Sequence, residues 1–165
     1  MTFDMSSIKK MQRHTMLKMR NSISEDYQKY CSQKISQFIF ALQVYQDAKC
    51  IALYQAVKRE ISLEYVFQQA KNTGKTCTFP ILQPEKTLKF GIASDKTIFK
   101  KNRFGILEPE TTTLHTPHID LYFLPLVAFD KYGNRLGMGA GYYDKTLAAI
   151  KNPFCIGIGY ALQQL

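Results

Sequence analysis

Residues 121–144 constrain the fold of this chain more than any other stretch. An apolar run over residues 121–129 ends in a turn signal, and a loop with glycines at positions 137, 139 and 141 follows it. Residues 142–150 are amphipathic and predict a helix. The order strand, glycine-rich loop, helix is typical of sites where backbone N–H groups and a helix N-terminus bind a phosphate.

Two charged residues strengthen the phosphate interpretation. Arg135 lies inside the loop and can bind phosphate oxygens through a bidentate guanidinium. Asp144 falls in the first turn of the predicted helix, where a carboxylate can hold a cation against those phosphates. The glycine spacing matches neither a Walker A loop nor a dinucleotide fingerprint. For the glycines alone, a merely flexible turn stays open as an alternative.

The rest of the chain alternates predicted helices with predicted strands. Helices are expected to start at residues that cap an N-terminus, namely Ser6 or Ser7, Ser24 and Ser62. Strands are expected in short apolar segments at residues 50–54, 75–79, 88–93, 121–129 and 154–160. Pro80 is expected to stop the second strand. Residues 96–118 are polar and aperiodic, so we expect strand fragments and loops there.

This alternation predicts an α/β fold. We expect three layers, α/β/α, around a mainly parallel central sheet. No repeat, low-complexity tract or linker divides the 165 residues, so a single domain spanning 1–165 is expected.

Charge narrows the class of partner without choosing one. Lysine and arginine number 22 against 13 acidic residues, which gives a net charge of +9 and favours anionic partners. No apolar stretch is long enough for a signal peptide or a membrane span, so we expect a cytoplasmic protein without a membrane partner. Four cysteines lie far apart and predict reduced, buried thiols.

Two further sets of residues are candidates for ligand contacts. Lys9, Lys10 and Arg13 share a predicted helix and form either an exposed basic face or a clamp for a polyphosphate. Glu60 follows the strand at residues 50–54, and ligands collect beyond the carboxyl ends of parallel strands. At that position the Glu60 carboxylate either accepts hydrogen bonds from N–H groups of a heterocyclic ligand or belongs to an ordinary surface loop.

Residues 124–144, LPLVAFDKYGNRLGMGAGYYD, resemble the signature of the 5-formyltetrahydrofolate cyclo-ligase family, also called 5,10-methenyltetrahydrofolate synthetases. The similarity extends to the basic N-terminal helix, to the segment ALYQAVKREIS around Glu60 and to TCTFPIL at residues 76–82. The resemblance implies an enzyme that uses ATP and Mg²⁺ to convert 5-formyltetrahydrofolate, free or polyglutamylated, into 5,10-methenyltetrahydrofolate. The formyl oxygen is phosphorylated first. A neighbouring amine then closes the ring and expels phosphate.

The resemblance also assigns roles to residues. It implies contacts with ATP for Lys9, Lys10, Arg13, Arg135, Leu136, Gly137, Met138, Gly139, Ala140, Gly141, Tyr142 and Tyr143. It implies contacts with the folate for Gln55, Glu60, Met138, Gly139, Ala140, Gly141 and Tyr142. Asp144 matches a magnesium ligand, and Arg135 and Tyr142 are the expected catalytic residues.

The chain departs from the family pattern at three places. Gln55 stands where other members often carry an apolar residue, and Ala140 stands where some carry lysine. Members usually continue beyond the position of Leu165 with an acidic segment that supplies another magnesium contact. We therefore expect the 165 residues to lack that contact.

Two other functions fit the composition less well. A small basic nucleic-acid-binding module needs a basic patch interleaved with exposed aromatic residues, whereas the basic residues here are dispersed. A phosphosugar-handling enzyme on a similar fold needs an acid–base pair near the glycine loop, and none is evident in the sequence. We expect a monomer that acts on small molecules and binds no nucleic acid.

Overall fold

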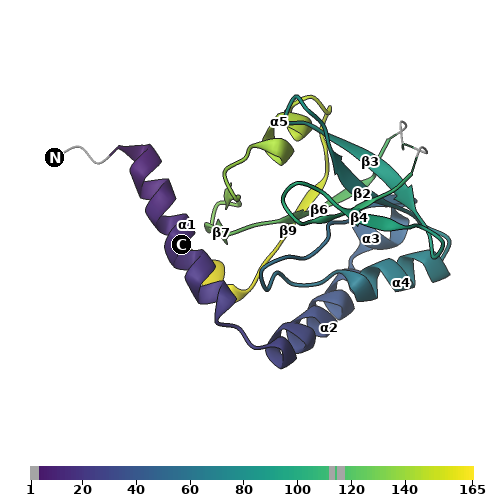
Figure 1. The fold of residues 1–165 in the computed structure, drawn as a ribbon. Coiled ribbons are helices and arrows are strands. Elements are labelled where there is room, and N and C mark those ends of the chain that lie inside the picture. Colours follow the sequence, from purple (N-terminus) through teal and green to yellow (C-terminus); the bar gives the residue numbers. More distant parts are fainter. Residues whose placement is uncertain (1–3, 112–113, 115–117) are drawn as a thin grey trace.

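The computed structural model describes residues 4–111, 114 and 118–165 (Figure 1). Its helices are α1 (Met5–Asn21), α2 (Glu25–Ala41), α3 (Gln43–Asp47), α4 (Glu64–Asn72), α5 (Tyr142–Ala148) and the short 3₁₀ helix η1 (Ala161–Gln163). Its strands are β1 (Cys50–Ala52), β2 (Thr76–Leu82), β3 (Leu88–Ala93), β4 (Phe99–Lys101), β5 (Leu107–Pro109), β6 (Leu121–Pro125), β7 (Ala128–Phe129), β8 (Arg135–Leu136) and β9 (Cys155–Ile158).

The central sheet has five strands in the order β3-β2-β1-β6-β9. Strand β1 pairs in parallel with β2 and β6, and β6 pairs in parallel with β9. Only β3, at one edge, runs antiparallel to its neighbour β2. The predicted α/β fold with a mainly parallel sheet is therefore confirmed.

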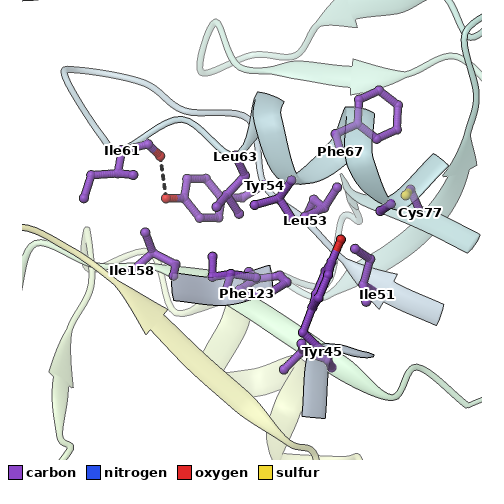
Figure 2. Close-up of a cluster of buried hydrophobic side chains, with 14 of the residues drawn as sticks. Tyr45, Ile51, Leu53, Tyr54, Ile61, Leu63, Phe67, Cys77, Phe123 and Ile158 are labelled. Atoms are coloured by element: carbon purple, nitrogen blue, oxygen red, sulfur yellow. Dashed lines mark hydrogen bonds between the residues drawn. The ribbon is translucent and has the colours of Figure 1, made fainter. Parts of the chain in front are cut away.

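Helices cover both faces of this sheet, because its strands are apolar on both sides. Ile51 of β1 and Phe123 of β6 point into the core beneath α2 and α4, where Tyr54 donates a hydrogen bond of 2.7 Å to the Ile61 carbonyl (Figure 2). The alternate residues Ala52 and Tyr122 belong to a second cluster, against which α5 packs. Figure 1 shows α5 alone on that face, so the third layer is thin.

Two of the three predicted helix caps need correction. Asp4, not Ser6 or Ser7, caps α1, because its side chain accepts a hydrogen bond of 3.2 Å from the Ser6 amide. Ser24 caps α2 as predicted. Helix α4 begins at Glu64, and its N-cap residue is Leu63, which makes no side-chain cap. Ser62 lies one residue before the N-cap position, and its hydroxyl accepts a hydrogen bond from the Glu64 amide.

Pro80 does not stop β2, which continues to Leu82. Strand β1 pairs only with residues 76–78 of β2, so Pro80 lies beyond the end of β1, where no neighbour needs its missing N–H. On the other side β3 pairs with all of residues 77–82. The proline is tolerated because it occupies a locally unpaired side of the strand.

The apolar run at residues 121–129 is not one strand. Strand β6 ends at Pro125, and residues 128–129 turn away to pair with residues 135–136 in the separate hairpin β7–β8. Two buried side chains bind the carbonyls at the break: Arg20 donates to Leu126 at 2.9 Å, and Gln163 donates to Leu126 and Val127 at 3.0 and 2.8 Å. The glycine loop is thus mounted on a small hairpin and not directly on the central sheet.

Residues 96–118 contain the antiparallel hairpin β4–β5, in agreement with the expected strand fragments; residues 112–113 and 115–117 lie outside the described part. All four cysteines are free, although only Cys50 and Cys77 are buried. None of the helices in the described ranges combines the length and the apolar character that crossing a membrane requires.

Candidate functional site

A cavity of about 880 Å³ lies beyond the carboxyl ends of the parallel strands. Gln55 after β1, Leu82 at the end of β2 and Leu126 after β6 all contribute to its wall. The remaining walls come from α1, from the β4–β5 hairpin and from the segment that runs from β7 to α5. This is the position where parallel sheets bind ligands, and the volume suits small molecules.

The glycine loop forms one wall of the cavity and packs against α1. Gly139 and Gly141 have φ angles of 96° and 77°, a left-handed conformation that glycine adopts without strain. Arg13 on α1 donates a hydrogen bond of 2.8 Å from Nε to the Gly137 carbonyl. Within the described ranges, the amides of Met138 and Ala140 have no hydrogen-bond acceptor, and both residues are exposed. The loop therefore offers N–H donors to a ligand.

Arg135 and Asp144 pair with each other across the loop. The Arg135 Nη2 and Asp144 Oδ1 atoms are 2.5 Å apart, and the Asp144 side chain is 76% exposed. The Arg135 side chain is only 18% exposed, but the Asp144 carboxylate remains largely in water, so a ligand can replace it as the partner of Arg135. The predicted phosphate clamp and the predicted cation ligand are thus held together before any ligand binds.

Helix α5 contributes less than the sequence suggested. It covers seven residues and ends at Ala148, two residues before the predicted end. A helix of two turns has a weak dipole. The loop amides, Arg13 and Arg135 are therefore the stronger candidates for binding an anion. Tyr142 at its start is buried, and burial raises the pKa of the neighbouring Tyr143 well above its ordinary value.

Glu60 lies in the cavity wall but is also part of a buried polar cluster. Its Oε1 atom is 3.3 Å from Arg20 Nη1, and its Oε2 atom accepts a hydrogen bond of 3.1 Å from the Val57 amide. Burial raises the pKa of this carboxyl, while Arg20 and the amide oppose the rise. Each carboxylate oxygen has more than one acceptor direction, so Glu60 retains capacity for a ligand N–H group.

The loop that carries Glu60 has an unusual backbone. Lys58 and Arg59 have φ angles of 48° and 61°, a conformation rarely adopted by residues other than glycine. Arg20 Nε donates to the Lys58 carbonyl at 3.0 Å, and the Tyr160 hydroxyl donates to the Arg59 carbonyl at 2.9 Å. These two bonds hold the strained turn in place and thereby position Glu60.

A model of the 5-formyltetrahydrofolate cyclo-ligase family matches residues 5–165. A 5-formyltetrahydrofolate cyclo-ligase from Haemophilus influenzae is 38% identical over 151 residues, which are 88% of this chain and 81% of that protein. Its Escherichia coli K12 counterpart is 29% identical and covers 86% of this chain and 81% of its own length. The chain belongs to the 5-formyltetrahydrofolate cyclo-ligase family.

Solved structures agree with this membership. The NMR structure of Aquifex aeolicus 5,10-methenyltetrahydrofolate synthetase superimposes with a TM-score of 0.84 at 28% identity, covering 95% of this chain and 80% of that one. A 5,10-methenyltetrahydrofolate synthetase from Mycoplasma pneumoniae gives a TM-score of 0.77 at 28% identity, covering 95% and 88%. The fold expected from the cyclo-ligase resemblance is thus confirmed by structure as well as by sequence.

Nearly all residues to which the cyclo-ligase resemblance gave a role line the one cavity. They are Lys9, Arg13, Gln55, Glu60, Arg135, Leu136, Gly137, Met138, Gly139, Ala140, Gly141, Tyr142, Tyr143 and Asp144. Lys10 is the exception, because it is exposed on α1 and does not line the cavity. Its assignment to ATP therefore has no support from its position, and the roles of the others remain predictions.

Sequence reasoning missed two contributors to this site. Arg20 is 1% exposed and anchors both Glu60 and its loop, but a single arginine in a basic helix carries no signal of burial. The tip of the β4–β5 hairpin, residues 102–106, adds Asn102, Phe104 and Ile106 to the wall. This tip lies in the least periodic stretch of the chain, where Gly105, typical of a tight turn, was the one local signal of a hairpin.

Proposed function

We propose that this protein converts 5-formyltetrahydrofolate into 5,10-methenyltetrahydrofolate at the expense of ATP, with Mg²⁺ as cofactor and ADP and phosphate as the other products. Membership in the cyclo-ligase family supports the folate conversion. The observation that carries the rest is the convergence of Arg13, Arg135 and the open loop amides on one wall of the cavity that Glu60 also lines. A polyphosphate and a heterocycle could therefore meet there.

In the proposed reaction the chain acts by position and charge. Arg13, Arg135 and the amides of residues 138–140 bind the phosphates and offset the negative charge that builds up on the terminal phosphoryl oxygens. Holding the formyl oxygen in line with that phosphorus makes the transfer effectively unimolecular. The folate amine then attacks the activated carbon and phosphate leaves, so no nucleophile from the enzyme is needed.

Asp144 is the proposed ligand for Mg²⁺. The ion prefers hard oxygen ligands and commonly takes one or two carboxylates together with substrate phosphates, which fits a single exposed carboxylate beside a phosphate site. When bound, Mg²⁺ neutralises phosphate charge. If Asp144 held the ion, the Arg135 guanidinium would be available to the phosphates.

The folate is proposed to lie toward Glu60 and Gln55, with the loop and Tyr142 between it and the ATP. Glu60 accepts N–H groups of the folate ring, and its buried setting strengthens such a bond. We further propose a monomer that is cytoplasmic, acts on small molecules, and has neither a nucleic-acid nor a membrane partner. We also propose that residues 1–165 form a single domain.

A direct assay tests the proposal. Purified protein is mixed with MgATP and 5-formyltetrahydrofolate, and the absorbance of the methenyl product is followed together with release of ADP and phosphate. We expect equal amounts of the three products, and no turnover when either ATP or Mg²⁺ is omitted. ATP hydrolysis without methenyl product, or methenyl product without ATP consumption, would contradict the proposal.

A further inference from the structure

The tip of the β4–β5 hairpin is held rigidly over the cavity. The Asn102 side chain accepts hydrogen bonds from the amides of Phe104 and Ile106, at 2.8 and 3.1 Å, and donates to Glu108 at 2.8 Å. Glu108 in turn accepts from the Leu82 amide of β2 at 2.9 Å. A turn fixed by four hydrogen bonds presents its side chains in defined positions.

This tip reaches across to Tyr142 at the start of α5. Arg103 Nη2 donates a hydrogen bond to the Tyr142 hydroxyl. The ring of Phe104 meets the Tyr142 ring edge to face, with centroids 6.2 Å apart and an interplanar angle of 81°. Tyr142 is 7% exposed and lines the cavity, whereas Arg103 is exposed and does not.

The direction of that hydrogen bond follows from chemistry. A guanidinium has donors only, so the phenol oxygen of Tyr142 must act as the acceptor. The phenol proton then has to point elsewhere. Within the described part of the chain it meets no acceptor, so it is available to a ligand in the cavity. A cation donating to the oxygen also polarises the O–H bond and makes it a stronger donor.

We propose that Arg103 is a positioning residue that sets the Tyr142 hydroxyl as a hydrogen-bond donor toward an anionic phosphoryl oxygen in the cavity. This inference rests on the proposed function, because it assumes that the transferred phosphoryl group passes the wall formed by Tyr142 and the glycine loop. The hydroxyl keeps its proton throughout and stabilises the charge that builds up on the oxygen during transfer. Arg103 acts through Tyr142 and touches neither substrate.

The kinetic test is a double-mutant cycle with a matched control. Arg103→Ala is expected to lower kcat about 5- to 10-fold while the KM for ATP changes less than about 2-fold, and Tyr142→Phe to lower kcat about 10- to 100-fold. Adding Arg103→Ala to Tyr142→Phe is expected to cost nothing more, since the hydroxyl it acts through is gone. Lys101→Ala removes an exposed cation from the same hairpin and should leave kcat unchanged.

A second measurement does not depend on catalysis. In protein labelled with ¹³C at the tyrosine Cζ position, the Tyr142 resonance is identified by its loss in Tyr142→Phe. We expect Arg103→Ala to shift that resonance, Arg103→Lys to shift it less and to restore part of kcat, and Lys101→Ala to leave it in place. If the wild type showed these resonance shifts but no turnover, the proposed function would be wrong, although the contact between Arg103 and Tyr142 would be confirmed.

Two results would overturn the inference in an active enzyme. In the first, Arg103→Ala raises KM by the same factor in wild type and in Tyr142→Phe, and added salt weakens the effect. Arg103 would then attract a substrate directly. The other is an unchanged Tyr142 resonance together with an unchanged kcat in Arg103→Ala.

Discussion

At the residue scale, two pairs of oppositely charged side chains shape the site. Arg135 pairs with Asp144, and Arg20 pairs with Glu60. In the first pair only Asp144 is well exposed, and solvent weakens that pair, whereas both partners of the second pair are buried. This difference in burial predicts different consequences for mutations at the two pairs.

Replacing Arg135 by Ala is expected to weaken ATP use. A hydrogen bond to a charged group contributes about 1.5–3 kcal/mol, so kcat/KM for ATP should fall about 10- to 100-fold, with little loss of stability. Steady-state kinetics at varied ATP measures this, with Lys131→Ala, an exposed cation of the same segment that does not line the cavity, as the control. Equal kinetics for Arg135→Ala and wild type would refute the clamp.

Replacing Glu60 by Gln is expected to weaken the folate more than ATP. The neutral amide has the same size and shape as the carboxylate but lacks the charge that attracts N–H groups of the ligand. In one of its two orientations it also turns its own N–H group toward the ligand. The KM for 5-formyltetrahydrofolate should rise about 10-fold or more, while that for ATP stays within about 2-fold. Glu64→Gln, at an exposed site on α4, is the control. An equal rise in both KM values would point to a folding defect instead.

At the element scale, α1 is anchored to the rest of the molecule near its C-terminal end. Figure 1 shows its N-terminal half projecting away from the sheet. Its C-terminal end is anchored by Arg20, which bonds to the carbonyls of Lys58 and Leu126 and pairs with Glu60. Its middle brings Lys9 and Arg13 to the cavity. One buried arginine thus couples the position of α1 to Glu60 and its loop.

Replacing Arg20 by Ala is expected to destabilise the fold by about 3–5 kcal/mol, because it leaves Glu60 buried without its partner. Without the opposing guanidinium, burial raises the pKa of Glu60 further, so the folded protein binds that proton more tightly than the unfolded chain. Stability that depends on the bound proton is present at low pH and lost as the pH rises through the raised pKa. The deficit should therefore be smaller at about pH 5 than at about pH 8.

Urea denaturation of Arg20→Ala and wild type at both pH values measures this. Lys18→Ala, an exposed position on the same helix, should differ from wild type by less than about 0.5 kcal/mol at either pH. A deficit that did not change with pH would mean that Glu60 does not titrate with the fold.

At the scale of the whole molecule, the sheet separates two apolar cores that lie on its opposite faces. Cys77 lies in one core and Cys50 in the other, and burial raises the pKa of each thiol to about 12. Cys155 is exposed on the edge strand β9. The cysteine thiols therefore differ in their exposure to solvent, from the buried Cys50 and Cys77 to the exposed Cys155.

A thiol-reactive dye at about pH 8 is expected to label Cys155 first. Cys50 and Cys77 should react only at the rate of global unfolding, because both thiols are buried and the dye cannot reach them in the folded protein. Denaturant should expose all four, and Cys155→Ser should remove the fast phase alone. Rapid labelling of Cys77 in native protein would contradict a closed core beneath α2 and α4.

Local sequence patterns determined much of this protein. The periods of apolar residues predicted α1, α2, α4 and the strands of the parallel sheet, but not the short α3, because amphipathic faces record which side is buried. The segment 124–144 identified the loop and one wall of the cavity. Such patterns depend on neighbours in the chain, so they can be recognised without the fold.

Only the tertiary structure decided the features that depend on residues far apart in sequence. Where the apolar run at 121–129 breaks, the Leu126 carbonyl accepts hydrogen bonds from Arg20, about a hundred positions earlier, and from Gln163. Pro80 is tolerated because β1 ends before reaching it. Arg103 meets Tyr142 only because a hairpin from an aperiodic stretch folds over α5. Hydrogen bonds and burial of this kind leave no local periodicity, since the partner is supplied by another part of the chain.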